Sequence, residues 1–178
     1  MEKRKIEILV GPPASGKSTY AKMLVEEQGF FRVNKDDLRR MLYGKQFVQE
    51  YEAIVEMVQR SVIYRLIHSW KSVVIDNTNL NTNSRQSLLL SIFTMFHDIR
   101  MSEYEIVYND SFCDVPLAEL VSRDKAREYS VGMDVLCDMH DLRNNYLAEK
   151  GEGLIGTEVE RILAMHEKAL DSSPSQRA

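Results

Sequence analysis

A mostly apolar segment runs directly into a glycine-rich loop near the start of the chain, and this junction constrains the fold more than any other feature. Ile6-Glu7-Ile8-Leu9-Val10 is typical of a buried strand, and Gly11-Pro12-Pro13-Ala14-Ser15-Gly16-Lys17-Ser18 follows without a break. The loop matches the pattern G-x-x-x-x-G-K-[ST], in which backbone N–H groups and a helix N-terminus hold phosphate groups. A chance match in a chain of this length is about a one-per-cent event. The sequence therefore predicts a strand, a phosphate-binding loop and a helix over residues 18–27.

The loop residues indicate a nucleoside triphosphate and a metal ion as ligands. Lys17 is expected to reach the β- and γ-phosphates of ATP, and the Ser18 hydroxyl is expected to bind the Mg²⁺ that bridges them. A glycine-rich turn that matches the pattern by chance is the alternative. The residues expected to bind the nucleotide are Gly11, Pro12, Pro13, Ala14, Ser15, Gly16, Lys17, Ser18 and Thr19.

Three more strands are expected, and two of them end in polar clusters. Residues 30–33 precede Asn34-Lys35-Asp36-Asp37, residues 72–75 precede Asp76-Asn77-Thr78-Asn79, and residues 104–108 form the last strand. Strands that alternate with helices predict a parallel sheet with right-handed crossovers, whose ligands gather beyond the carboxyl ends of the strands. The predicted fold class is a three-layer α/β P-loop NTPase core with a parallel sheet of four to five strands. The polar clusters should meet at one edge of that sheet.

Apolar periodicity and turn residues place the remaining helices. One helix carries Leu38, Met41 and Leu42, and others are expected over residues 82–96, 116–123, 132–148 and 158–170. A long amphipathic helix is predicted to pack on the sheet through Phe47, Tyr51, Ile54, Val55, Val58, Val62 and Leu66. Residues 1–170 are expected to form a single domain, with residues 171–178 as a loose tail.

The charge balance argues against a protein that binds nucleic acid over its whole surface. The net charge is −4 at pH 7, whereas such binders usually carry an excess of basic residues. A local positively charged site is still compatible with the sequence, because basic residues cluster in two short segments. These residues are Lys35, Arg39, Arg40, Arg123, Lys125 and Arg127. The N-terminal apolar run is too short for a signal or membrane segment, so a cytoplasmic protein is expected. The cysteines and histidines lack the spacing of disulfide or zinc sites.

Asp36 is the candidate for the group that accepts a proton from an alcohol during phosphoryl transfer. Such a transfer needs a carboxylate that orients the hydroxyl for in-line attack. Asp37 is its neighbour, and both could instead cap the helix that follows. Arg39, one helical turn later, could hold a substrate phosphate through its planar donor fork, or it could lie on a solvated helix face.

Two further groups complete the candidate site. Arg123 and Arg127 would share a helix face and form a lid that offsets charge on the phosphates, although surface ion pairs with neighbouring glutamates are the alternative. Asp76 and Thr78 follow the third strand, where an acidic group can organise Mg²⁺ through water or contact the nucleophile. A structural Asx turn is the other interpretation of that segment.

The ordered motifs resemble the kinase domain of polynucleotide 5′-hydroxyl kinases, which are found in phage and eukaryotic nucleic-acid repair enzymes. The resemblance implies an adenylate-kinase-like core with a helical lid and with ATP and Mg²⁺ as cofactors. It is carried by the segments Gly11–Thr19, Asn34–Arg39, Ile75–Asn81, Asp114–Arg127 and Met133–Leu136.

Carried over to matching positions, the resemblance makes Asp36 the general base and leaves Lys17 at the phosphates. Arg123 would bind the nucleotide from the lid, and Arg127 would be the catalytic residue of that lid. The residues implied at the acceptor strand are Arg39, Thr78 and Asn79.

Four functions are open from the sequence. The leading hypothesis is ATP-dependent phosphorylation of the 5′-hydroxyl end of DNA or RNA, with the oligomeric state undetermined. Related phage P-loop kinases phosphorylate 5-hydroxymethyluracil bases within DNA, and an enzyme of that type would work in the host cytoplasm and flip the base out of the stack. A small-metabolite kinase and a non-catalytic nucleotide-binding module are the other two.

Overall fold

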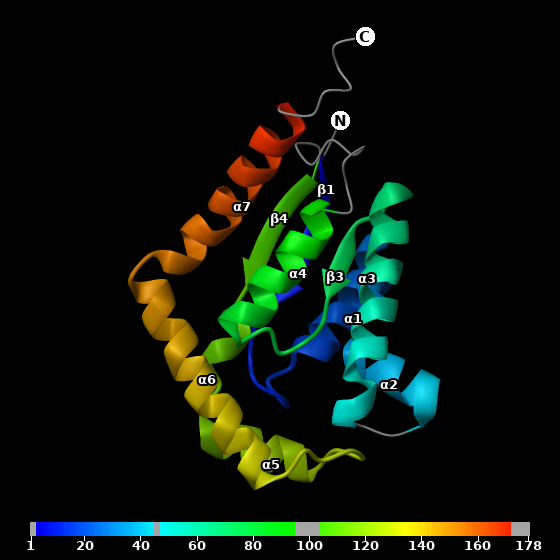
Figure 1. Cartoon of the computed structure of the whole chain (residues 1–178). Coiled ribbons are helices and arrows are strands. Elements are labelled where there is room, and N and C mark those ends of the chain that lie inside the picture. Colours follow the sequence, from blue (N-terminus) through cyan, green and yellow to red (C-terminus); the bar gives the residue numbers. More distant parts are fainter. Residues whose placement is uncertain (1–2, 45–46, 95–103, 172–178) are drawn as a thin grey trace.

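A single four-stranded sheet forms the centre of the protein. Its strands are β1 (Arg4–Leu9), β2 (Phe31–Val33), β3 (Val73–Ile75) and β4 (Tyr104–Asn109). Figure 1 shows the computed structural model, which describes residues 3–44, 47–94 and 104–171. The strand order is β2-β3-β1-β4, and every neighbouring pair is parallel. The predicted parallel sheet with its crossover connections is confirmed.

Helices connect the strands and extend beyond them. Within the described residues the α-helices are α1 (Lys17–Gln28), α2 (Lys35–Tyr43), α3 (Glu52–His68), α4 (Thr82–Thr94), α5 (Leu117–Lys125), α6 (Met133–Gly151) and α7 (Leu154–Asp171), and there are short 3-10 helices at Gln49–Tyr51 and Ser111–Asp114. The helix predicted over residues 158–170 begins earlier, at Leu154. Asp171, predicted to begin the loose tail, is the last residue of α7. Residues 95–96 and the rest of the predicted tail, 172–178, lie outside the described part of the chain. None of the described helices is long and apolar enough to cross a membrane.

Side chains alternate between the two faces of the sheet, and helices cover both. On one face Ile8 shares a core with Ile63 of α3 and Leu89 of α4. On the other face Leu9 packs with Leu24 of α1. This arrangement is the predicted three-layer fold. Figure 1 shows α2 and α5 at the carboxyl ends of the strands, with α6 and α7 leading back along the β4 side.

The predicted core face of the long helix is only partly right. Val55 is buried and Leu66 packs against the core, whereas Ile54 and Val62 are exposed. The helix α3 begins at Glu52, after Phe47 and Tyr51, and these two residues are exposed as well. The buried residues of the helix are Val55, Gln59, Ile63 and Ile67, which recur at intervals of four and form a neighbouring stripe. The sequence places apolar residues on two adjacent faces of the helix, and only one of them can lie against the sheet.

Gly11 occupies a place where a larger residue does not fit. A Cβ at this position would lie 2.8 Å from the Phe112 Cβ and 3.2 Å from the Phe112 carbonyl group. We predict that Gly11→Ala costs about 1–3 kcal/mol of unfolding free energy, because the backbone of the neighbour must move. A thermal melt measures the change. Gly151→Ala is the matched control, since nothing lies within 4 Å of a Cβ there, and it should melt like the wild type or higher. Equal melting temperatures for the two variants would contradict the close packing.

Candidate active site

The glycine-rich loop is fixed between the ends of two strands. The Val10 N–H donates to the Asn109 carbonyl at 2.8 Å, and the Gly11 N–H donates to the Thr78 carbonyl at 2.9 Å. Gly16 adopts a left-handed conformation with φ of 101°, which turns the chain into α1. The loop therefore presents the positive N-terminal end of α1 on the side where the strands end.

Lys17 is a charged side chain held away from water. Its Nζ donates to the Pro12 carbonyl at 2.5 Å and to the Ser15 hydroxyl at 3.3 Å, and only 6% of the residue is exposed. Burial lowers the pKa of Lys17 to about 8, although the negative charges of Asp76 and Asp36 oppose this shift. Both predicted carboxylates thus lie close enough to act on this ammonium group. Neutral oxygen atoms are its hydrogen-bond partners, and a phosphate group would be a stronger one.

Asp36 lies in the first turn of α2, at the carboxyl end of β2. Asn34 caps this helix by accepting a hydrogen bond from the Asp37 N–H at 2.9 Å. The capping role that the sequence left open therefore belongs to Asn34, and the Asp36 side chain stays more than half exposed. Arg39 donates to the Asp36 carboxylate through NH1, and it donates to Glu52 through Nε and NH2 at 2.7 Å each. Glu52, which the sequence gave no reason to single out, fixes the position of Arg39.

Asp76 is buried and carries an ion pair. Its Oδ2 accepts hydrogen bonds from the Nε of Arg32 at 2.8 Å and from NH2 of the same guanidinium at 2.7 Å. Arg32 also bonds Asp37, so it ties the end of β3 to α2. Among the described residues, no group of three or more His, Cys, Asp or Glu side chains is arranged so that it could hold a metal ion. Mg²⁺ in phosphate-binding sites takes few protein ligands, and the exposed Ser18 hydroxyl at the start of α1 fits that requirement better than the occupied carboxylate of Asp76.

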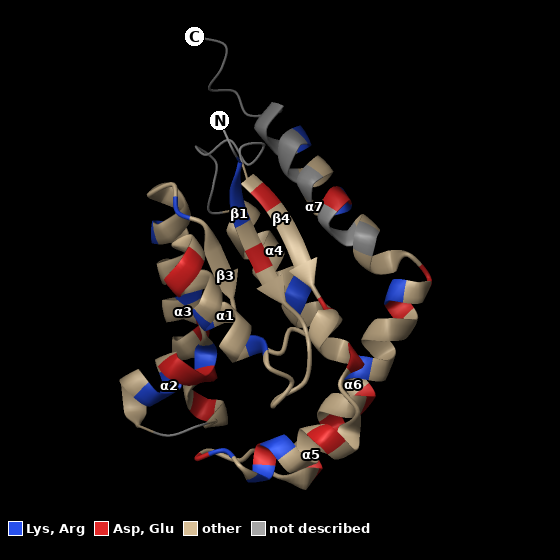
Figure 2. Cartoon of the chain, turned by 180° about the vertical axis from the view of Figure 1, so that it is seen from behind, with Lys and Arg blue, Asp and Glu red and all other residues tan. Residues whose placement is uncertain are grey.

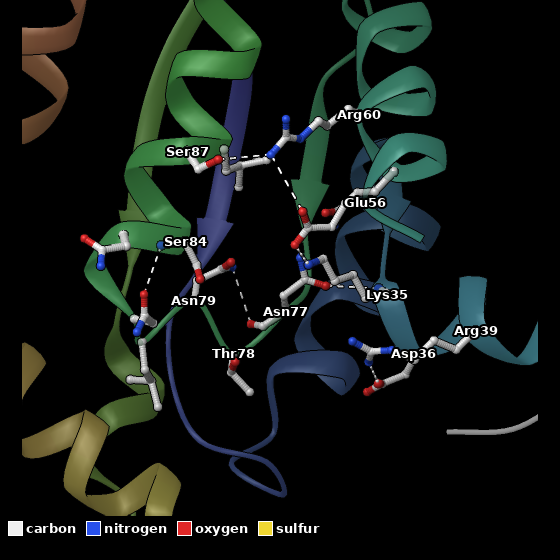
Figure 3. Close-up of a pocket in the computed structure, with 15 residues that line it drawn as sticks. Lys35, Asp36, Arg39, Glu56, Arg60, Asn77, Thr78, Asn79, Ser84 and Ser87 are labelled. Atoms are coloured by element: carbon white, nitrogen blue, oxygen red, sulfur yellow. Dashed lines mark hydrogen bonds and ion pairs between the residues drawn. The ribbon is translucent and has the colours of Figure 1, made fainter. Parts of the chain in front are cut away.

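A cavity of about 380 Å³ opens beside Asp36 and runs between α3 and α4. Figure 3 shows Glu56 and Arg60 of α3 facing Ser84 and Ser87 of α4 across it, with Asp36 on the α2 side. Arg60 bridges the two helices by donating to the Ser87 hydroxyl at 3.0 Å. The predicted site residues that line this cavity are Asp36, Arg39, Thr78 and Asn79.

The Asn79 side chain also has a structural task. Its Nδ2 donates to the Leu9 carbonyl at 2.7 Å, and its backbone is left-handed with φ of 48°. Its carbonyl in turn accepts a hydrogen bond from Arg85 of α4 at 3.1 Å, and Arg85 is fully buried. Arg85 supports the loop that forms the cavity wall. Its position in the apolar stripe with Leu88 and Ile92 was the signal in the sequence that could have identified it.

The lid, defined as α5 with residues 126–132, is organised by a buried carboxylate. Asp124 accepts hydrogen bonds from the Ser130 hydroxyl at 2.6 Å and the Gly132 N–H at 3.2 Å, and it lies 3.3 Å from Arg127. Burial alone would raise the pKa of Asp124, but these hydrogen bonds and the nearby Arg127 lower it below its ordinary value. Sequence reasoning missed this residue because an aspartate between basic neighbours looks like a solvated one.

The two predicted lid arginines lie on the side of the glycine-rich loop. Arg123 donates to the Ala14 carbonyl at 3.5 Å and also pairs with Glu119. Arg127 lies near enough to Lys17 to contribute to the lowered pKa of that lysine. Arg123 thus makes the surface ion pair with a neighbouring glutamate that the sequence offered as the alternative, whereas Arg127 pairs with the buried Asp124. The role of both arginines in a lid stays a prediction.

Comparisons with known proteins identify the family. The model of the AAA domain family matches residues 6–144, which is most of the chain. The chain belongs to the AAA domain family. A bifunctional polynucleotide phosphatase/kinase of Schizosaccharomyces pombe is 39% identical over 85 residues, which are 48% of this AAA domain chain and 17% of that protein.

Two solved structures share the fold of this AAA domain. A chain of the Pnkp1/Rnl/Hen1 RNA repair complex is 25% identical with a TM-score of 0.66, over 84% of this chain and 47% of that one. A second structure of the Pnkp1/Rnl/Hen1 complex gives 27% identity and a TM-score of 0.58, over 75% and 42% of the two chains. The AAA domain chain thus spans less than half the length of these relatives. Its sequence is similar to part of a polynucleotide phosphatase/kinase, and its fold is similar to chains of the Pnkp1/Rnl/Hen1 complex.

Removal of the buried charge at Lys17 should stabilise the ligand-free AAA domain and weaken its affinity for ATP. We predict that Lys17→Met raises the melting temperature at pH 7, where the ammonium is charged and buried. The same change should weaken ATP binding about 10- to 100-fold, because a charge-assisted hydrogen bond to phosphate is lost. Lys22→Met, at an exposed position of α1, is the control and should change neither quantity. A destabilised Lys17→Met protein that still binds ATP normally would refute this role.

Nucleotide binding should take up a proton near pH 8. Phosphate charges next to Lys17 must raise its pKa above the value of about 8 in the free protein. At a pH just above 8 the free lysine is partly neutral and the bound one charged, so ATP affinity should fall as pH rises through this range. Calorimetric titrations in buffers with different ionisation enthalpies measure the uptake directly. A binding enthalpy that does not depend on the buffer at pH 8.5 would show that Lys17 does not change its protonation.

Proposed function

We propose that this protein transfers the γ-phosphate of ATP to the 5′-hydroxyl end of a polynucleotide. The observation that carries the proposal is that the loop of Lys17 and the cavity wall with Asp36 meet at Thr78, whose carbonyl accepts a hydrogen bond from Gly11 and which lines the same cavity as Asp36. A phosphate-binding lysine and an exposed carboxylate at the mouth of a polar cavity are the groups that transfer to an alcohol requires. The similarity to a polynucleotide phosphatase/kinase supports a polynucleotide as the acceptor.

In the proposed reaction some residues bind ATP, the phosphate donor, and others act on the hydroxyl group that accepts the phosphate. Lys17 and the N-terminus of α1 hold the phosphates, while Asp36 accepts the proton of the attacking hydroxyl. Arg127 offsets the charge that develops on the transferred group. Ser18, with Asp76 acting through water, would hold Mg²⁺, which would neutralise part of the charge of the phosphates.

Arg39 is proposed to contact the phosphate that follows the 5′-terminal nucleoside. It donates to Glu52 and Asp36 through Nε, NH1 and NH2. A guanidinium carries about five N–H groups, so donors remain for a phosphate oxygen. Because Glu52 and the Phe47 ring hold the guanidinium in place, Arg39 would set the distance between the acceptor strand and Asp36.

The proposed unit comprises residues 1–170, because Ile162 of α7 shares the core that β1 and α4 form. Its proposed place of action is the cytoplasm, or the host cytoplasm if the protein is encoded by a phage.

The acceptor is tested by offering radiolabelled ATP with four substrates. These are a 5′-hydroxyl oligonucleotide, its 5′-phosphorylated counterpart, a duplex that contains 5-hydroxymethyluracil, and a panel of small alcohols. The proposal expects label only on the first, whereas a kinase for internal bases would label the third regardless of the 5′ end. A cavity of about 380 Å³ is large enough for a base or a small sugar. The four substrates therefore distinguish a kinase for 5′ ends from one for internal bases or small alcohols.

Asp36→Asn should reduce transfer at least 100-fold while ATP affinity is unchanged, because a general base contributes about that much to the rate. Asp37→Asn is the matched control. It removes a carboxylate that pairs with Arg32 and Arg40, so it should lower the melting temperature and leave transfer within about tenfold of the wild type. Transfer rates and ATP dissociation constants are measured for both. A fully active Asp36→Asn enzyme would remove Asp36 from the mechanism.

A further inference from the structure

A glutamine interrupts the buried apolar stripe of α3. Val55, Ile63 and Ile67 of that stripe are at most 1% exposed, and Gln59 between them is 3% exposed. The Gln59 Nε2 has no hydrogen-bond partner within the described part of the chain. A buried amide without a partner destabilises a protein, and an apolar residue would serve the core better. The stability of the free protein therefore does not explain why a glutamine occupies this position.

Gln59 lies where the core meets the cavity that holds Asp36. It lines that cavity, and the next stripe residue toward the core, Ile63, packs in the same cluster as Leu88 of the opposite wall. Charged groups on the same wall are already paired, since Lys35 binds Glu56 at 2.9 Å and Arg60 binds Ser87 at 3.0 Å. The Nε2 of Gln59 is thus a hydrogen-bond donor of a cavity-lining residue for which the described part of the protein supplies no acceptor.

The remaining cavity lining shows which part of an acceptor fits there. Uncharged amides and hydroxyls line the cavity on the side of α4 and the residue before it, contributed by Asn81, Asn83, Ser84 and Ser87. Figure 3 shows Ser84 and Ser87 on this side. The cations Lys35 and Arg39 lie on the α2 side, where phosphates would gather. A neutral amide wall suits the uncharged nucleoside, because a glutamine amide can both donate to and accept from a base edge or a sugar hydroxyl.

We infer that Gln59 hydrogen-bonds an uncharged polar group of the 5′-terminal nucleoside and so determines which termini the enzyme prefers. The inference rests on the proposed function, since it assumes a polynucleotide acceptor. Gln59 does not touch the reacting atoms in this account. It distinguishes acceptors because a terminus that lacks the matching group leaves the amide buried and unpaired.

The test compares Gln59→Leu with the wild type on a set of 5′-hydroxyl oligonucleotides. The set varies the terminal base through all four bases, and it varies the terminal sugar between ribose and deoxyribose, so the two sources of the hydrogen bond are separated. Transfer rates, KM values, ATP affinity and melting temperature are measured for each protein. Gln28→Leu, at an exposed position of α1, is the matched control.

For Gln59→Leu we expect kcat/KM on the preferred terminus to fall roughly 10- to 100-fold, and the preference among termini to collapse. The melting temperature should stay equal or rise, because the variant removes a buried unpaired amide, and ATP affinity should not change. A lowered melting temperature with unchanged preferences would show a purely structural glutamine and overturn the inference. Unaltered kcat/KM ratios would overturn it as well. If the wild type labels no 5′-hydroxyl oligonucleotide at all, the proposed function fails, and the inference fails with it.

Discussion

The burial of one positive charge governs the arrangement of this site. Lys17 is enclosed by a loop that offers it carbonyl and hydroxyl oxygens, and the loop is held in place by hydrogen bonds to the Thr78 and Asn109 carbonyls. Removal of an ammonium group from water is unfavourable unless negative charge is near. Asp76 and Asp36 supply that charge from the two neighbouring strand ends. The parallel sheet matters for function because it brings these three residues to one edge.

The sequence predicted the parts of the site that depend on local backbone rules. The glycine-rich loop, the strands around it and the polar clusters after β2 and β3 follow from short patterns, and the structure contains all of them. A pattern could not tell which face of α3 is buried, because Ile54 and Ile63 are equally apolar and only the packed fold separates them. The buried polar residues were not predicted from the sequence for a related reason. Asp124 has partners that come from a later segment of the chain, and nothing in its local sequence indicates them.

Charge pairing limits the positive charge that the protein presents around the cavity and the lid. The arginines around the cavity and the lid each have an acidic partner: Arg39 with Glu52, Arg40 with Asp37, Arg123 with Glu119 and Arg127 with Asp124. Figure 2 shows basic and acidic residues mixed on α2 and α5 instead of a continuous basic stripe. Such pairs fix the direction of each guanidinium while they limit attraction to phosphates along a strand. On the proposed function, recognition is therefore concentrated at the end of the polynucleotide.

A crystal structure with a non-hydrolysable ATP analogue, Mg²⁺ and a 5′-hydroxyl oligonucleotide tests the central claim most directly. The account predicts that the γ-phosphate contacts the Nζ of Lys17, and that the terminal 5′ oxygen lies within hydrogen-bond distance of the Asp36 carboxylate, in line with the bond to be broken. An oligonucleotide end bound away from the cavity, with Asp36 still engaged only by Arg39, would contradict the account.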